Sequence, residues 1–131
     1  LEIVEKVYAR DLEKIQIAIS LLKESGYKIA IDDFGVEYSN LSILEEIDFD
    51  SIKLDKCFAD NISISKITNE VIAFISKITL ITDKMLVIEG VEQKYQIEEI
   101  KKIVNKNVYI QGYYYSKPMN IEELKEFSLE E

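Results

Sequence analysis

Short apolar runs alternate with amphipathic stretches along the whole chain. Residues 12, 15, 19 and 22 are leucine or isoleucine, and this three- and four-residue spacing predicts a helix that begins near Asp11 and ends at Gly26. Further helices are predicted around residues 41–47 and over 61–77, 93–104 and 121–127. Apolar, β-branched runs predict strands at residues 1–4, 27–31, 51–54, 85–88 and 108–110.

This alternation predicts an α/β fold in one domain. The strands are almost continuously apolar, which is typical of a parallel sheet covered by helices. The segment 61–77 carries the longest helical pattern, with an apolar stripe formed by Ile64, Ile67, Val71, Phe74, Ile75 and Ile78. With 131 residues the chain has the length of a single domain, and no linker or proline-rich segment divides it.

The charge balance limits the possible ligands. Sixteen basic and 25 acidic residues give a net charge of −9 and a pI of about 4.6. Such a chain has no basic field that would attract a DNA or RNA polymer or an anionic lipid surface. A phosphate ligand would therefore need a cation to mediate its binding.

The absence of histidine excludes Ser-His-Asp and Cys-His catalysis and the usual zinc sites. The single cysteine, Cys57, allows no internal disulfide and is expected to be a small core residue, which suits a cytoplasmic setting. No apolar run is long enough for direct membrane insertion, although a longer parent protein could be membrane-anchored. The chain begins at Leu1 and not at methionine, so we expect it to be a piece of something longer.

Each predicted strand ends at residues that can do chemistry. In chain order these are Glu2 and Glu5, Asp32 and Asp33, Lys53 and Asp55, Glu89, and Gln111. Because ligand sites of α/β proteins gather at the carboxyl ends of the strands, several carboxylates would share one cleft and repel one another. Divalent cations with hard oxygen ligands relieve that repulsion, and a pair of them can assist hydrolysis of a phosphodiester.

Each signal also has a plainer interpretation. Asp32 and Asp33 could form only a turn, and Lys53 could be a solvated lysine on a sheet edge. Glu89 could cap a helix, and the residues after Gln111 could be aromatics that merely pack. What favours a functional site is the repetition of such residues at successive strand ends.

Four motifs together resemble the EAL domain family. They are Asp32-Asp33-Phe34-Gly35, Lys53-Leu54-Asp55, Glu89-Gly90-Val91-Glu92 with Gln96, and Gln111-Gly112-Tyr113. Leu1–Glu5 also resembles the strand that precedes the first motif in that family. The resemblance implies a modified TIM-like (β/α) barrel that hydrolyses cyclic di-GMP to pGpG with two Mg²⁺ or Mn²⁺ ions.

The resemblance also implies roles for individual residues. Metal ligands would be Glu2, Asp32, Asp33 and Glu89, while Lys53 would hold the nucleophilic water with Gln111 beside it. Glu5 would anchor the loop that follows Asp33, Asp55 would lie near the nucleotide, and Glu92 would lie next to the site.

Two departures from the family pattern shape the expectations. Residues 1–131 resemble only the C-terminal portion of one EAL domain, a partial barrel of about five strands without the Glu-Ala-Leu signature, where a whole barrel takes about 250 residues. The loop Val36–Leu41 places Glu37 where the family has glycine. The preferred hypothesis is therefore part of a phosphodiesterase that is inactive in isolation. One alternative is a degenerate EAL module that senses cyclic di-GMP or binds a protein. Another is a half-barrel that forms a homodimer through its exposed strand edges.

Overall fold

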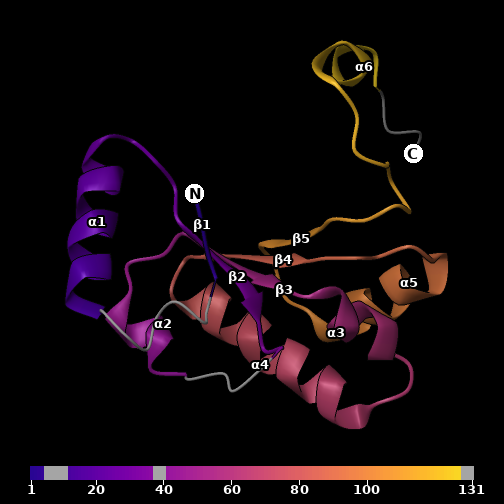
Figure 1. The fold of residues 1–131 in the computed structure, drawn as a ribbon. Coiled ribbons are helices and arrows are strands. Elements are labelled where there is room, and N and C mark those ends of the chain that lie inside the picture. Colours follow the sequence, from indigo (N-terminus) through magenta and orange to yellow (C-terminus); the bar gives the residue numbers. More distant parts are fainter. Residues whose placement is uncertain (5–11, 37–40, 128–131) are drawn as a thin grey trace.

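A computed structural model describes residues 1–4, 12–36 and 41–127. Five strands form one parallel sheet in which each pairs with the next along the chain (Figure 1). They are β1 (Glu2–Val4), β2 (Ala30–Phe34), β3 (Ser51–Leu54), β4 (Met85–Ile88) and β5 (Val108–Ile110). Because the order contains no reversal, the sheet is wound in one direction, as in a (β/α) barrel and unlike a doubly wound sheet. The predicted α/β fold with five parallel strands is confirmed.

Six helices accompany the described strands. They are α1 (Leu12–Glu24), α2 (Ile43–Glu46), α3 (Lys56–Asn61), α4 (Lys66–Ile81), α5 (Lys94–Ile103) and α6 (Ile121–Glu126). Helices α2 to α5 gather on one side of the sheet, while α6 stands away from the body at the end of an extended segment (Figure 1). Within the described residues, no helix combines the length and the apolar character needed to cross a bilayer.

The predicted helix over 61–77 is wrong at its start, because two helices meet there. The side chain of Asp55 accepts a hydrogen bond from the Cys57 amide and begins α3. The hydroxyl of Ser65 accepts one from the Thr68 amide and begins α4. The apolar spacing runs through this break, so periodicity alone does not reveal it.

The bounds of the second strand also differ from the prediction. The strand was expected over 27–31, but β2 covers Ala30–Phe34 and contains Asp32 and Asp33. Ile31 lies opposite Ile52 and Phe34 opposite Leu54, so β2 has one residue more than β3 over this stretch. This is a β-bulge, a feature that re-aims side chains next to functional sites.

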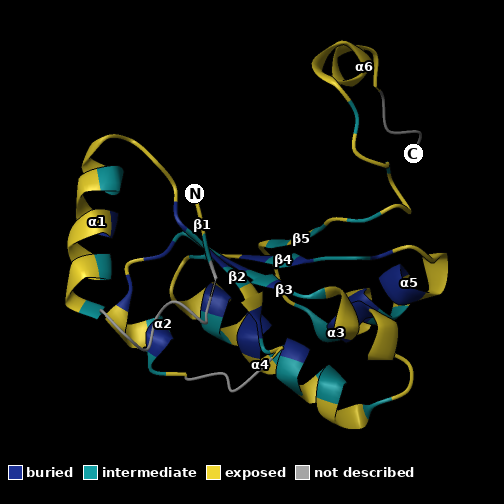
Figure 2. Ribbon diagram, viewed as in Figure 1, coloured by how far each residue is buried: buried dark blue, intermediate teal, exposed yellow. Residues whose placement is uncertain are grey.

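The core lies between the sheet and the helices. Alternate strand residues are buried there, namely Ile31, Phe34, Ile52, Leu54, Leu86 and Ile88 (Figure 2). Residues between them, such as Lys53 and Val87, point to the other face, which is only partly covered. Site chemistry can therefore sit on this second face without disturbing the core.

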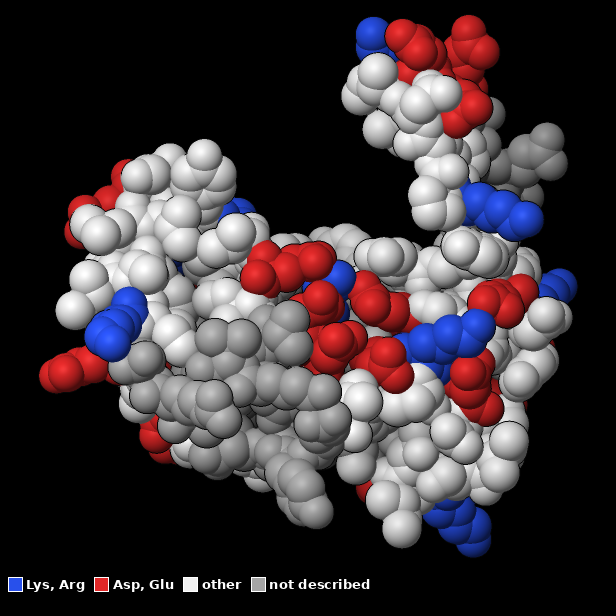
Figure 3. Space-filling model, viewed as in Figure 1, with Lys and Arg blue, Asp and Glu red and all other residues white. Residues whose placement is uncertain are grey.

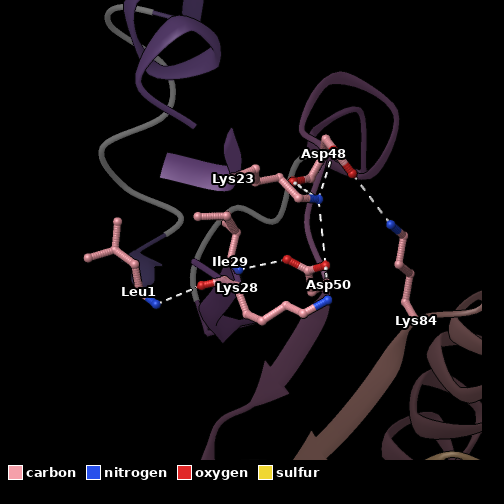
Figure 4. A network of polar contacts seen from close by, with 7 residues as sticks. All are labelled: Leu1, Lys23, Lys28, Ile29, Asp48, Asp50 and Lys84. Atoms are coloured by element: carbon pink, nitrogen blue, oxygen red, sulfur yellow. Dashed lines mark hydrogen bonds and ion pairs between the residues drawn. The ribbon is translucent and has the colours of Figure 1, made fainter. Parts of the chain in front are cut away.

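The amino ends of the strands are held by a separate polar network (Figure 4). Asp50 Oδ2 accepts a hydrogen bond of 2.8 Å from the Ile29 amide, while Lys23 and Lys28 lie 3.6 and 3.5 Å from its other oxygen. Lys23 also forms an ion pair of 2.7 Å with Asp48. In barrel folds this end serves stability, whereas ligands bind at the opposite end.

Candidate active site at the carboxyl ends of the strands

Strand pairing places four of the predicted site residues on one face of the sheet. Glu2 pairs with Ala30, and Ala30 with Ser51, so Asp32 and Lys53, two residues further along, share that face. Lys53 pairs with Val87, and Glu89 follows two residues later. The period of two and the parallel register thus bring residues from four strand units to one mouth.

Lys53 is the centre of this cluster. Its Nζ lies 2.6 Å from Glu2 Oε1, 2.7 Å from Glu89 Oε1 and 3.0 Å from Asp32 Oδ1. The side chain of Lys53 is 12% exposed. Burial alone would lower its pKa, but the nearby carboxylates of Glu2, Glu89 and Asp32 outweigh burial and raise the pKa of Lys53 above its usual value. The lysine is therefore a firmly charged counter-ion for three carboxylates.

Asp33 reaches the surface through the bulge in β2. Strict alternation after Asp32 would turn its side chain toward the helices. Asp33 instead has φ of 53° and is exposed. Aspartate tolerates this left-handed conformation better than most residues. Two adjacent carboxylates can thus both remain outside the core.

Asp55 and Glu92 stand beside the Lys53 cluster and have other partners. Asp55 caps α3, and the hydrogen bond from the Cys57 amide lowers the pKa of its carboxyl. Glu92 pairs with Lys56, whose aliphatic chain covers Gly90. The loop that carries Glu89 and Glu92 is consequently fastened to the start of α3.

Gln96 fastens the same loop from inside. Its buried side chain accepts hydrogen bonds from the amides of Glu92 and Gln93, at 2.8 and 2.9 Å, and donates one of 3.1 Å to the Ala59 carbonyl. Through this one side chain the backbone at residues 92 and 93 is tied to the backbone of Ala59 in α3. Gln96 therefore fixes the end of β4 relative to α3.

Gln111 and Glu89 border a cavity of about 820 Å³ next to the Lys53 cluster. Lys56, Tyr113 and Lys117 also line it, and Lys117 Nζ lies 5.8 Å from the centre of the Tyr113 ring. Lys56 and Lys117 are basic residues of this mouth that the sequence motifs do not single out. Position could have indicated them, since each follows a strand-end motif by a few residues in a mouth dominated by acidic side chains.

The donor chemistry of the mouth fits a divalent cation. Acidic side chains gather over the sheet around a basic one (Figure 3), and carboxylate oxygens are the ligands that Mg²⁺ and Mn²⁺ prefer. Asp32 Oδ1 is buried and has no hydrogen-bond partner. In the described part of the chain, however, no three acidic or thiol side chains are grouped so as to hold an ion directly. The carboxylates point to Lys53 instead.

Glu5, a predicted site residue, lies outside the described residues, and so does Glu37 in the loop after β2. The prediction that Cys57 lies in the core is wrong, because α3 turns Phe58 and Ala59 inward and leaves Cys57 exposed in its first turn. Burial of the thiol and its hydrogen bond to Asp55 nevertheless raise the pKa of Cys57 to about 11.

Among proteins of known sequence, the chain is similar to several bacterial signalling proteins. It is 35% identical over 126 residues to the oxygen sensor protein DosP of Escherichia coli, which covers 94% of this chain and 15% of that protein. It is 31% identical over 131 residues to the cyclic di-GMP phosphodiesterase NbdA of Pseudomonas aeruginosa, covering 97% of this chain and 16% of NbdA. The chain thus spans less than a fifth of either relative.

Solved structures and a family profile identify the same group of proteins. The EAL domain of Mycobacterium smegmatis DcpA superposes with a TM-score of 0.85 at 28% identity, covering 96% of this chain and 56% of that one. A manganese and cyclic di-GMP complex of Klebsiella pneumoniae BlrP1 gives 0.81 at 28% identity, covering 89% and 29%. These neighbours confirm the predicted TIM-like fold class. The EAL domain profile matches residues 1–118, and the chain therefore belongs to the EAL domain family.

Proposed function

We propose that this chain supplies one part of a metal-dependent site that hydrolyses cyclic di-GMP to pGpG. The observation that carries the proposal is the convergence of Glu2, Asp32 and Glu89, from three strand units, on Lys53. Relatives named as cyclic di-GMP phosphodiesterases and the BlrP1 complex support the substrate. The domain assignment, residues 1–131 as the C-terminal portion of an EAL domain, belongs to the same proposal.

In this site Glu2, Asp32, Asp33 and Glu89 would hold two Mg²⁺ or Mn²⁺ ions. When bound, such ions make a coordinated water more acidic and offset charge on the phosphodiester oxygens. Lys53 would hold and orient the attacking water, with Gln111 beside it at the rim of the cavity. Asp55 and Glu92 would keep the surrounding loops in place, and Glu5 is assigned to anchoring the loop after β2.

Lys53 has a second task in this proposal. It would offset part of the negative charge of the three carboxylates while cations are absent, and would be free to contact water and substrate when they bind. Hydrolysis further requires groups that these residues do not provide, because the chain spans about half of a solved EAL domain. We therefore expect the 131-residue chain alone to bind metal without turning over cyclic di-GMP.

Calorimetric titration with Mn²⁺ tests the site. We expect Asp32→Asn to weaken Mn²⁺ binding at least about tenfold, since a carboxylate that would hold the ion loses its charge. Asp48→Asn is the matched control, because Asp48 lies at the opposite end of the strands. Equal Mn²⁺ affinity of the two variants would contradict the metal site.

A chromatographic assay for pGpG tests the reaction. Turnover by the isolated chain would contradict its expected inactivity. Binding of cyclic di-GMP with Mn²⁺ present, without turnover even in a longer protein that contains a whole EAL domain, would favour the sensor function instead. The departure from the family at Glu37 is the feature that keeps this second function open.

A further inference from the structure

Gln96 is a buried polar side chain with more hydrogen bonds than its place in α5 requires. It is 2% exposed and occupies the third position of the helix, where its oxygen accepts a hydrogen bond from the Gln93 amide and completes a capping box. A cap needs no further bond from this side chain. Because a buried amide group is costly unless its polar atoms are bonded, the other contacts of Gln96 are informative.

These other contacts run to the loop after β4 and to α3. The oxygen of Gln96 also accepts a hydrogen bond of 2.8 Å from the Glu92 amide, and the side-chain nitrogen donates one of 3.1 Å to the Ala59 carbonyl, 37 residues away in the chain. The Ala59 carbonyl also accepts a longer bond of 3.5 Å from the Ile62 amide at the end of α3. Because α5 begins beside α3 (Figure 1), one side chain joins the two.

The loop that Gln96 holds carries Glu89. The Glu89 amide donates a hydrogen bond of 3.0 Å to the Leu54 carbonyl of β3. The Val91 amide donates one of 3.2 Å to the Gln111 carbonyl after β5. These two bonds fix the loop against the neighbouring strands. Gln96 fixes its far end, three residues beyond Glu89, against α3.

The contact between Glu89 and Lys53 depends on where this loop lies. Glu89 Oε1 is 2.7 Å from Lys53 Nζ, and the Glu89 side chain is 20% exposed. Gly90 follows with φ of 67°, so the backbone turns directly after Glu89. Binding groups act together only when they are held to within about 0.5 Å, so a small shift of the turn would separate the carboxylate from the cluster.

We propose that Gln96 is a positioning residue for Glu89. It ties the loop after β4 to α3 and thereby keeps the Glu89 carboxylate beside Lys53, where a divalent cation would bind. It acts through the backbone, because its hydrogen bonds reach backbone atoms of other residues. The part that concerns the cation rests on the function proposed above, whereas the placement of Glu89 beside Lys53 does not.

Calorimetric titration of Gln96→Met with Mn²⁺ tests the positioning role. Methionine keeps most of the side-chain volume and removes all three hydrogen bonds. We expect the Kd for Mn²⁺ to rise about tenfold or more, because residues that orient metal ligands affect affinity by that much. Gln96→Glu is the milder variant, since glutamate still caps α5 but, when ionised, has no proton for the Ala59 carbonyl. Its Kd should lie between those of the wild type and Gln96→Met.

Ser76→Ala is the matched control for lost stability. Ser76 is also buried, and its hydroxyl accepts a hydrogen bond of 2.9 Å from the Asn105 amide, which joins α4 to the segment before β5. This variant should unfold more easily and bind Mn²⁺ as the wild type does. Circular dichroism identifies the variants that are folded at the titration temperature. If the wild type binds Mn²⁺ and a folded Gln96 variant binds it equally well, the proposal is overturned.

A double-mutant cycle tests the placement of Glu89 without any metal. Lys53→Met is combined with Gln96→Met, and urea unfolding is measured with no divalent cation present. If both changes act on the contact between Glu89 and Lys53, their effects on the equilibrium constant for unfolding should deviate from independence by about fivefold or more. Lys53→Met with Ser76→Ala should be independent within about twofold. Independence of the first pair as well would overturn the proposal. Coupling in a chain that binds no Mn²⁺ would support the placement of Glu89 and overturn the proposed function alone.

Discussion

Asp32 Oδ1 lies 3.0 Å from Lys53 Nζ, as an ion pair without hydrogen-bond geometry, although the oxygen is buried and has no other polar partner. Glu2 and Glu89, by contrast, lie closer to the same ammonium, at 2.6 and 2.7 Å. Asp32 is therefore the carboxylate that gains least from the lysine and has the most to gain from a cation.

Replacing Lys53 by methionine should destabilise the chain at neutral pH by roughly 1–3 kcal/mol, because three carboxylates then share a mouth without a cation. The raised pKa of Lys53 means that its contribution is fully present below about 10.5 and is lost only above it. The deficit of the variant should therefore stay constant between about pH 6 and 9, where Lys53 is charged throughout. Urea unfolding over this range measures it.

Lys102→Met is a suitable control for that measurement. Lys102 pairs with Glu99 on the surface of α5, so its loss should cost no more than about 0.5 kcal/mol. A deficit in Lys53→Met as small as that in Lys102→Met would contradict the role of Lys53 as the counter-ion of the three carboxylates.

Protonation of the Asp50 carboxylate should lower the free energy of unfolding in acid. Its burial raises the pKa of the carboxyl, but the Ile29 amide and Lys23 and Lys28 outweigh that effect, so the net pKa is lowered. The stabilisation is present above the ordinary value near 3.8 and is lost as the pH falls through the lower folded value. We expect Asp50→Asn to cost about 0.5–1 kcal/mol at pH 7.

Asp50→Ala should cost more, about 1–3 kcal/mol, because it also leaves the Ile29 amide without its acceptor. Thermal or urea unfolding at pH 7 compares the two variants. If alanine and asparagine were equally tolerated, the hydrogen bond from Ile29 would contribute nothing and the ion pairs alone would matter.

Sequence patterns predicted the sheet well because strand polarity and strand ends are local features. The α/β class, the parallel order and the end of α1 at Gly26 follow from apolar runs and a glycine stop signal. Predicting that Glu2, Asp32 and Glu89 meet at Lys53 requires one more assumption, namely that successive strands lie side by side. That assumption holds here because the sheet contains no reversal in strand order.

Other features depend on tertiary contacts that periodicity does not record. The bulge at Asp33 is set by pairing with β3. Ile67 and Phe74 of α4 have the spacing of a core-facing surface, yet both are exposed, and the helix buries the neighbouring face with Ile72 and Ile75. Cys57 is apolar by type but follows an N-cap at the surface. In each case several arrangements satisfy the local pattern, and packing decides among them.

The thiol of Cys57 should react slowly despite its exposure. Burial and the neighbouring Asp55 raise its pKa to about 11, so little thiolate is present at pH 8. We expect iodoacetamide alkylation, followed by mass spectrometry, to accelerate up to about pH 11. Asp55→Asn should shift this profile to lower pH, while asparagine still caps α3. A midpoint near 8.5 in the unaltered chain, the value of a free thiol, would contradict the expectation.

Gly112 should be the least replaceable glycine near the site. A Cβ there would lie 2.0 Å from the Val91 carbonyl oxygen and 2.4 Å from the Val91 nitrogen. These backbone groups hold the β4 and β5 loops together, since the Val91 amide donates to Gln111 and the Val91 carbonyl accepts from Tyr114. Backbone cannot move aside as a side chain can. Gly112→Ala should therefore cost about 3 kcal/mol or more in urea unfolding.

Gly26→Ala provides the comparison that separates crowding from strain. Gly26 has φ of +85° at the end of α1, but a Cβ there would meet nothing within 4 Å. Its substitution should cost only the left-handed penalty, about 1 kcal/mol. Because Gly112 has no such φ, a cost above that of Gly26→Ala would come from the clash with Val91. Costs of equal size would mean that the two loops can separate, and the site that includes Glu89 and Gln111 would then be less rigid than its contacts imply.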